Sequence, residues 1–454
     1  MDAKSRLNLI REVGEEIITE DDLLDLLSKK KNPIAYDGFE PSGKDIHIAQ
    51  GLLRAANINK MTRAGVCFKM WVADWHAWAN NKMGGNLEHI QKVGEYLIEV
   101  WKACGMDIRN VEFVWAKEAM KDPQYWNLVM NIARLSTVKR ITRCSQIMGR
   151  SESESLQASQ IFYPCMQCAD IFYLKADITQ LGLDQRKVNV LARELGPKLG
   201  YYKPAIVSHH MLMGLCTPAP KIKEIDSFAN AVKENKTPTH ANIFDFTPKT
   251  LGFGYEQLQQ DIEKHYPLLS HYVGKTNETA GGRIGEKFNT LVACVRTERR
   301  GNIKELHQEL TDLAFELRNQ YFEQRQMSLK MSKSKPDSAI FMTDSEEDIR
   351  KKISKAYCPE GEKEENPILE YCRYLLFEMM KSITVERQAG GAISYDSYGA
   401  LEAAFVRREI HPADLKEAVS FGLNTLLLPV RKSLASNRKA TALQKEIRSF
   451  EVTR

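Results

Sequence analysis

The sequence of 454 residues predicts an α/β protein with a Rossmann-like parallel-sheet domain, a helical insertion and an all-α C-terminal domain. Short apolar runs alternate with helical periodicity over residues 1–215, which indicates strands joined by crossover helices and therefore a parallel sheet. Residues 216–327 hold helical segments between loop signals. From Asn366 onward the apolar periodicity is helical throughout, which predicts the all-α domain.

In the first domain, the apolar runs place each strand, and the helices fill the intervals between them. Two N-terminal helices are expected, because Leu7, Ile10, Val13 and Ile17 recur at helical spacing and Thr19 with Asp22 is typical of a capping box. Strands are expected at 34–36, 68–73, 111–115, 176–181 and 205–208, and helices at 87–104, 161–174 and 186–195. Ligands bind at the carboxyl ends of such strands, where Asp74 and His76 fall.

The later part of the chain is expected to contain a basic loop with a linker over 328–360 and a helical domain over 361–454. Ser345 and Asp348 predict a capped helix, and further helices are expected at 369–380, 398–405 and 415–434. The insertion over 216–327 carries no recognisable catalytic pattern. We therefore expect two or three domains, as the length also suggests.

The composition is that of a globular protein, with 43% hydrophobic and 27% charged residues. The net charge of +5 is compatible with a polyanionic partner but does not argue for one alone. Nine cysteines without disulfide-framework spacing favour a reducing compartment. The N-terminal stretch has no apolar signal region, and no apolar run reaches membrane-spanning length, so we expect a cytoplasmic protein without membrane contact.

The stretch from Ile34 to Gly51 predicts an anion site. A buried strand breaks into a turn through Pro41, Ser42 and Gly43, and a helix starts near His47. Backbone N–H groups and the helix dipole point at such a turn, and Gly38 lets a ligand approach the backbone. Downstream, Lys330-Met-Ser-Lys-Ser334 supplies cations and hydroxyls. Together they indicate a nucleoside triphosphate site, although a plain basic surface run is the ordinary explanation of the lysines.

A second constellation lies on the expected helix 161–174. Tyr163, Gln167 and Asp170 are four and three residues apart and so share one face, which suits a small zwitterion with a polar side chain. A polar surface stripe is the alternative; it fits badly, because much of this helix is placed in the core by its apolar residues Ile161, Phe162, Ile171 and Phe172. Cys165 and Cys168 on the same helix have no partners at metal-ligand spacing, so we expect core packing and no protein-bound metal.

Two of these motifs carry a resemblance to a known family. His47-Ile-Ala-Gln50 resembles the HIGH signature, and Lys330–Ser334 matches the KMSKS signature; in this order they mark class I aminoacyl-tRNA synthetases. The surrounding residues resemble the eukaryotic and archaeal tyrosyl-tRNA synthetases over nearly the whole chain outside the insertion. The resemblance implies a tyrosine–tRNA ligase that uses ATP with Mg²⁺, forms tyrosyl-adenylate and transfers tyrosine to the terminal adenosine of tRNA(Tyr) in cytoplasmic translation.

The resemblance also implies roles for individual residues. The catalytic residues would be His47, Lys330 and Lys333. Tyr36 and Asp170 would bind the substrate phenol, while the α-amino group would lie against Tyr163, Gln167 and Gln185, with Glu40 nearby. ATP would be bound by Gly38, Ser42, His47, Gln50, Gly182, Asp184, Lys330, Ser332 and Lys333. Gln50 replaces the second histidine of HIGH, which leaves open whether position 50 takes part in catalysis.

The same family binds tRNA through a helical domain and is homodimeric. His411-Pro-Ala-Asp414 matches its motif for the first anticodon base, although Asp414 would serve equally well as a helix N-cap. The stacking partner of that base would fall near Ala389, where alanine cannot stack, so another residue such as Tyr395 would be needed. Residues 120–159 would correspond to the connective, dimer-forming region.

Two alternatives remain open. A tryptophanyl-tRNA synthetase shares the fold and both signatures, but Tyr36 with Asp170, and the turn from Asp184 to Lys187, argue against it. A non-catalytic RNA-binding or signalling paralogue would keep the fold without the chemistry. The presence of His47, Lys330 and Gln185 argues against such a loss.

Overall fold

The computed structural model describes residues 1–148, 156–218, 330–331, 336–387 and 390–450, with single positions between 290 and 329. The chain forms two compact units, Met1–Thr217 with Lys330–Arg454, and Pro218–Leu329. The fold below is that of the first unit. Ser332, Lys333, Ala389 and nearly all of the expected insertion lie outside the described residues.

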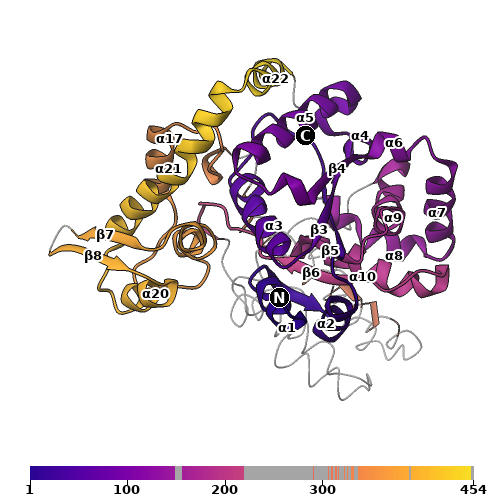
Figure 1. The fold of residues 1–454 in the computed structure, drawn as a ribbon, viewed down its shortest axis with the longest axis horizontal. Coiled ribbons are helices and arrows are strands. Elements are labelled where there is room, and N and C mark those ends of the chain that lie inside the picture. Colours follow the sequence, from indigo (N-terminus) through magenta and orange to yellow (C-terminus); the bar gives the residue numbers. More distant parts are fainter. Residues whose placement is uncertain are drawn as a thin grey trace. The chain divides into compact units, whose positions relative to one another are not determined.

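A six-stranded sheet forms the centre of the N-terminal half, residues 1–217, in the order β1-β6-β5-β2-β3-β4. Its strands are β1 (Gly14–Ile18), β2 (Ile34–Phe39), β3 (Cys67–Val72), β4 (Val111–Trp115), β5 (Ile178–Gly182) and β6 (Ala205–His209). All neighbouring pairs are parallel except β1 with β6. The predicted parallel sheet is therefore confirmed, and helices surround it (Figure 1).

The helices of this half are α1 (Ala3–Arg11), α2 (Glu20–Lys29), α3 (Arg54–Arg63), α4 (Asp74–Ala79), α5 (Leu87–Ala103), α6 (Ala116–Ala119), α7 (Pro123–Arg134), α8 (Val138–Thr142), α9 (Ala158–Tyr173) and α10 (Arg186–Leu195). The helices predicted at 87–104, 161–174 and 186–195 are present within a few residues of their expected ends, as α5, α9 and α10. The Thr19 side chain caps α2 by accepting from the Asp22 N–H, as its pattern predicts.

The edge strand β1 is a difference from the sequence prediction. The first helix ends at Arg11, and Ile17 lies in β1, paired antiparallel with Val207 of β6. The prediction failed because Val13 and Ile17 are four residues apart, and a separation of four also returns to the same face of a strand.

The C-terminal part is mainly helical, as predicted, but it also contains a hairpin. Its elements are α17 (Glu346–Lys355), α18 (Pro367–Tyr371), η9 (Cys372–Leu376), α19 (Phe377–Met379), β7 (Ile383–Arg387), β8 (Gly391–Tyr395), α20 (Tyr398–Val406), α21 (Pro412–Ser436) and α22 (Arg438–Arg448). In β7 the buried Ile383 and Val385 alternate with exposed Thr384 and Glu386. This period of two predicts a strand, but it is too short to outweigh the helical pattern around it.

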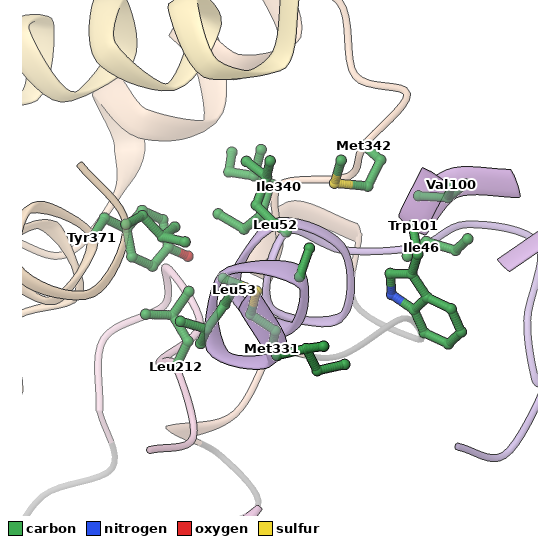
Figure 2. Packing of buried hydrophobic residues seen from close by; sticks show 14 of the residues in the cluster. Ile46, Leu52, Leu53, Val100, Trp101, Leu212, Met331, Ile340, Met342 and Tyr371 are labelled. Atoms are coloured by element: carbon green, nitrogen blue, oxygen red, sulfur yellow. The ribbon is translucent and has the colours of Figure 1, made fainter. Parts of the chain in front are cut away.

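The helix that follows His47 is the meeting point of three distant parts of the sequence. It opens as η1 (Ala49–Leu53) and continues as α3. Figure 2 shows Leu52 and Leu53 of this helix beside Leu212, Met331, Ile340 and Tyr371, all of which belong to one buried cluster. Burying this apolar surface fixes the start of the helix against the segments on either side of the KMSKS signature.

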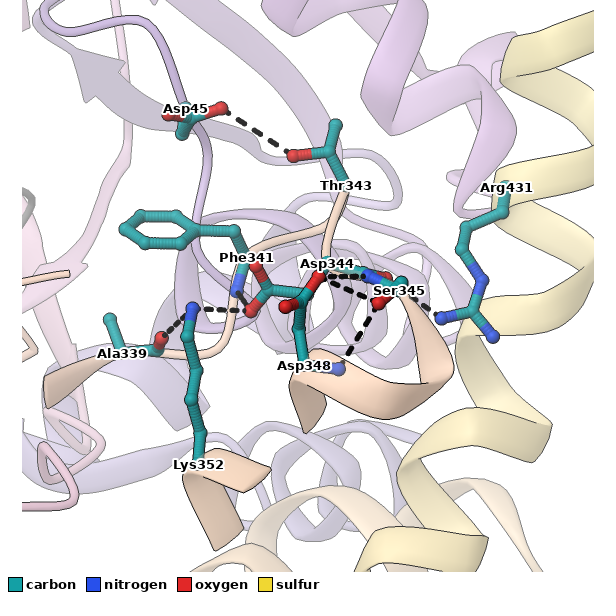
Figure 3. Close-up of polar contacts among 9 residues, drawn as sticks. All are labelled: Asp45, Ala339, Phe341, Thr343, Asp344, Ser345, Asp348, Lys352 and Arg431. Atoms are coloured by element: carbon teal, nitrogen blue, oxygen red, sulfur yellow. Dashed lines mark hydrogen bonds and ion pairs between the residues drawn. The ribbon is translucent and has the colours of Figure 1, made fainter. Parts of the chain in front are cut away.

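The segment after that signature is fixed by polar contacts as well (Figure 3). Asp344 Oδ2 accepts from the Phe341 N–H at 2.9 Å and from Lys352 Nζ at 2.7 Å, and Arg431 Nη1 donates to the Asp344 carbonyl at 2.9 Å. Phe341 pairs in turn with His47 in an isolated β-bridge. The segment 339–345, which follows the signature, is therefore anchored beside the helix that begins near His47.

Among the helices of the described residues, none is both long enough and apolar enough to cross a membrane.

Candidate active site

A pocket opens at the carboxyl ends of β2, β5 and β6, where β2 pairs with β3 on one side and β5 on the other. This is the switch point of the strand order, the usual ligand site of an open parallel sheet. Most of the site residues predicted from the sequence line it, namely Tyr36, Gly38, Glu40, His47, Gln50, Tyr163, Gln167, Gly182, Asp184, Gln185 and Lys330.

A buried carboxylate, Asp170, is not itself among the lining residues but lies directly behind two of them, Tyr36 and His76. Asp170 on α9 is fully buried; its Oδ1 accepts from Tyr125 Oη at 2.7 Å, and its Oδ2 accepts from Tyr36 Oη at 3.5 Å. Burial raises the pKa of the Tyr36 phenol well above its ordinary value, so that phenol remains a donor at neutral pH. Carboxylate and hydroxyl together can accept from and donate to one substrate hydroxyl.

His76 is a further group at this end, and the sequence placed it only at the end of its strand. Its ring is 1% exposed, Nε2 lies 3.0 Å from Asp170 Oδ2, and the ring stands edge-on to Tyr163 at 5.2 Å. Nε2 therefore faces a carboxylate, while Nδ1 has no hydrogen-bond partner within the described residues. A buried imidazole that lines a pocket with one nitrogen unsatisfied is available to a ligand.

Tyr125 was missed by the sequence analysis altogether. It is fully buried on α7, and the same hydroxyl that donates to Asp170 also lies 3.3 Å from the Met166 carbonyl. No local pattern could have found it, since forty-five residues separate it from Asp170 along the chain. Only the packing of α7 against α9 brings the two together.

The middle of the pocket presents amide and carboxylate groups. Gln167 Nε2 donates to Gln185 Oε1 at 3.0 Å, and Gln185 Nε2 donates to the Ile147 carbonyl at 3.2 Å. The buried Tyr163 hydroxyl donates to Glu40, whose Oε1 also accepts from Asn80 Nδ2 at 3.0 Å. These contacts engage the donor groups of Gln167, Gln185 and Tyr163. The wall therefore presents acceptor oxygens to the pocket, which is the arrangement that an ammonium group requires.

The opposite end of the pocket holds the two signature residues. Lys330 Nζ donates to Asp184 Oδ2 at 3.0 Å, and the backbone of Lys330 pairs with Met213. The carbonyl of His47 accepts from the N–H groups of Gln50 and Gly51, which opens the helix at that residue. A helix start and a lysine across the same pocket are suited to a phosphate chain.

Two positions acquire a clearer physical reason here. A Cβ atom on Gly38 would fall 2.6 Å from Tyr36 Oη, so glycine is required to keep that hydroxyl in place, besides leaving the backbone open. The Gln50 carbonyl accepts from Trp101 Nε1 at 2.7 Å, while its side-chain Oε1 is buried and has no partner in the described part of the chain.

Some predicted residues are not brought to this pocket. Ser42 is not among the lining residues, and Ser332 and Lys333 lie outside the described residues. His411 is itself the N-cap of α21, with Nδ1 accepting from the Ala413 N–H at 3.2 Å. Asp414 therefore does not cap the helix; it lines a separate groove with Glu386, Phe421 and Arg431.

Cys165 and Cys168 pack in the core of the N-terminal half, as expected. Burial raises the pKa of the Cys165 thiol to about 12, so it stays protonated and is a poor metal ligand. In the described ranges, no group of three His, Cys, Asp or Glu side chains is placed to hold a metal ion.

The sheet order, the pocket at its switch point and the histidine and lysine signatures facing it define a class I aminoacyl-tRNA synthetase. A family model for class I tRNA synthetases (W and Y) matches residues 28–223 and 299–427. The chain belongs to this family.

Two plant tyrosine enzymes are among the similar proteins. The chain is 40% identical to tyrosine–tRNA ligase 1, cytoplasmic, of Arabidopsis thaliana, over all of this chain and 90% of that one. It is also 40% identical to tyrosine–tRNA ligase 2, cytoplasmic, of the same plant, but spans only 46% of its length.

Solved structures show the same likeness. The tyrosyl-tRNA synthetase of Leishmania major with tyrosinol aligns with a TM-score of 0.71 and 36% identity, over 99% of this chain and 66% of that one. The tyrosyl-tRNA synthetase of Pyrococcus horikoshii with L-tyrosine aligns with a TM-score of 0.70 and 30% identity, over 98% and 100% of the two chains.

Proposed function

We propose that the protein is a tyrosine–tRNA ligase that activates L-tyrosine with ATP and transfers it to the terminal adenosine of tRNA(Tyr). The observation that carries this proposal is the buried Asp170 carboxylate beside Tyr36 Oη, directly behind the pocket wall that Tyr36 forms. A phenol satisfies both groups, whereas an indole would bring one donor and no acceptor. Recognition of the hydroxyl at this point separates tyrosine from the tryptophan accepted by other members of the family.

In the proposed adenylation step, the tyrosine carboxylate attacks the α-phosphate of ATP in line, and pyrophosphate leaves. The α-amino group lies against Tyr163, Gln167 and Gln185, with Glu40 behind them. His47 and Lys330, together with Lys333, stabilise the charge that develops on the phosphates, so catalysis is positioning and electrostatics. Mg²⁺ arrives with ATP and neutralises part of the phosphate charge.

In the same proposal, Asp184 binds the ribose of the adenylate and exchanges its contact with Lys330 when the nucleotide enters. Their present separation of 3.0 Å supports this, because the lysine is held at the pocket by a group that the nucleotide also needs. Gly38, Gly182, Ser42, Gln50 and Ser332 complete the nucleotide site.

The proposed partner is tRNA(Tyr), bound in the cytoplasm by a homodimer. His411 and Asp414 would read the first anticodon base at the N-terminus of α21, where a carboxylate can accept from a guanine amino group. The dimer surface would lie on α7 and α8. It is supported by Trp126, Met130, Leu135 and Val138, large apolar side chains that are 37%, 50%, 45% and 68% exposed there.

ATP–pyrophosphate exchange tests the proposed activity. Exchange is expected with tyrosine, and at background level with tryptophan or without an amino acid. Since adenylation precedes tRNA binding, the result does not depend on the source of the tRNA. Exchange driven by tryptophan would make the chain a tryptophan enzyme, and no exchange with any amino acid would make it a non-catalytic relative.

A further inference from the structure

His210 stands at a junction of three elements, and none of the roles proposed above involves it. It follows β6 directly; its Nδ1 lies 2.9 Å from Oε2 of Glu15 in β1, and its Nε2 lies 3.1 Å from Oε2 of Glu370 in α18. The ring stacks on Tyr374 of η9 at 4.2 Å with an interplanar angle of 9°. One imidazole therefore joins the edge of the sheet to the C-terminal helices.

This junction favours the protonated ring. Burial lowers the pKa of His210, but the two carboxylates outweigh it and raise the pKa from 6.5 to about 9. The titratable groups facing the ring are Glu15, Glu370, Arg373, Tyr374 and the neighbouring His209. Because the folded-state pKa is the higher one, the contact is complete below pH 6.5 and is lost as the pH rises through about 9.

The junction continues into the active site through Met213. Glu370 Oε2, which faces His210, also accepts from the Met213 N–H at 2.9 Å, and Tyr371 Oη donates to the Met213 carbonyl at 3.1 Å. Met213 in turn pairs with Lys330 in a β-bridge. A single carboxylate thus links His210 to the segment on which the backbone of Lys330 rests.

We propose that the charged His210 ring is a positioning residue for ATP activation, which joins Glu15 to Glu370 and so holds residues 211–215, and through Met213 the backbone of Lys330, at the pocket. The proposal rests on the function proposed for Lys330. According to this proposal, the kcat/KM for ATP falls at alkaline pH. The KM for tyrosine, whose site is lined by α9, does not change in the same way.

The test compares the parent with His210→Gln in ATP–pyrophosphate exchange between pH 6.5 and 10, with ATP and tyrosine varied separately. Glutamine is neutral and cannot span both carboxylates. At pH 7 the kcat/KM for ATP is expected to fall about tenfold, with the KM for tyrosine changed less than about twofold. The parent is expected to lose a similar factor as the pH rises through about 9, so the two converge.

The ratio of parent to variant is the readout, because pH effects that do not involve His210 are common to both enzymes. A ratio that stays constant with pH, or a loss confined to tyrosine, would overturn the inference. Glu370→Gln keeps an acceptor for Met213 but removes one charge next to His210. Its kcat/KM for ATP is therefore expected to fall at a lower pH than that of the parent. This second variant tests the proposal if His210→Gln does not fold. Absence of tyrosine-dependent exchange in the parent would instead reject the proposed function.

Discussion

Asp170→Asn is expected to lower the kcat/KM for tyrosine in ATP–pyrophosphate exchange by about 100-fold or more, while the KM for ATP changes by less than about twofold. Asparagine has the size of aspartate, so the buried site is not emptied. It replaces a charged acceptor by an amide whose N–H₂ end must face Tyr36 Oη or Tyr125 Oη, both donors to the present carboxylate. The substrate phenol then loses its acceptor.

Tyr125→Phe is the matched control for this substitution. It removes the 2.7 Å hydrogen bond to Asp170 Oδ1 but leaves the carboxylate itself in place. An intermediate loss of about tenfold, again confined to tyrosine, is expected. Equal losses for tyrosine and ATP in Asp170→Asn would mean that the fold, and not phenol recognition, had been damaged.

Lys330→Ala is expected to reduce kcat of adenylation by about 100- to 1,000-fold, because it removes a cation aimed at charge that develops in the transition state. The KM for tyrosine should be nearly unchanged, since Lys330 contacts Asp184 and the partners of Asp170 are Tyr36 and Tyr125. Single-turnover formation of tyrosyl-adenylate, followed in both enzymes, measures the step directly.

Lys44→Ala provides the comparison for a lysine outside the pocket. Lys44 follows the turn of the nucleotide site, but its Nζ donates to the Arg448 carbonyl at the protein surface. The substitution Lys44→Ala should change the rate of adenylation by less than about twofold. If Lys330→Ala were as active as Lys44→Ala, the lysine of the signature would have no part in catalysis.

Much of the site could be predicted because its residues fall within short segments that have a local signal. Tyr163, Gln167 and Asp170 share one helix face by their spacing alone, and the structure brings all three to the pocket or its floor. The strands β3 to β6 were predicted within about two residues, because each is a compact apolar run flanked by polar turns.

The remaining features depend on contacts between distant segments. Tyr125 and His210 meet their partners only after α7 packs on α9 and after α18 packs beside β6, and nothing in the adjacent residues announces either contact. The hairpin of β7 and β8 was missed for a different reason. Its alternation extends over five residues a strand and is interrupted by Gly390 and Gly391, whose positive φ angles of 138° and 75° make the turn.

Glycine is needed at position 38 for two reasons, and the sequence indicated only one of them. The sequence suggested that glycine lets the nucleotide approach the backbone. The structure adds that a side chain there would strike the Tyr36 hydroxyl, which is part of the proposed tyrosine site. In the proposed function, amino-acid recognition and nucleotide binding therefore both constrain the same short strand, β2.

In the proposed function, the buried pair of Tyr36 and Asp170 selects the substrate by its phenolic hydroxyl. The most direct measurement compares the kcat/KM of tyrosine with that of phenylalanine in ATP–pyrophosphate exchange, in the parent and in Asp170→Asn. The parent is expected to prefer tyrosine by at least about 100-fold, because phenylalanine leaves buried polar groups without a partner, and the variant should lose most of that preference. A parent that uses both amino acids equally well, or a variant that keeps the full preference, would contradict the account.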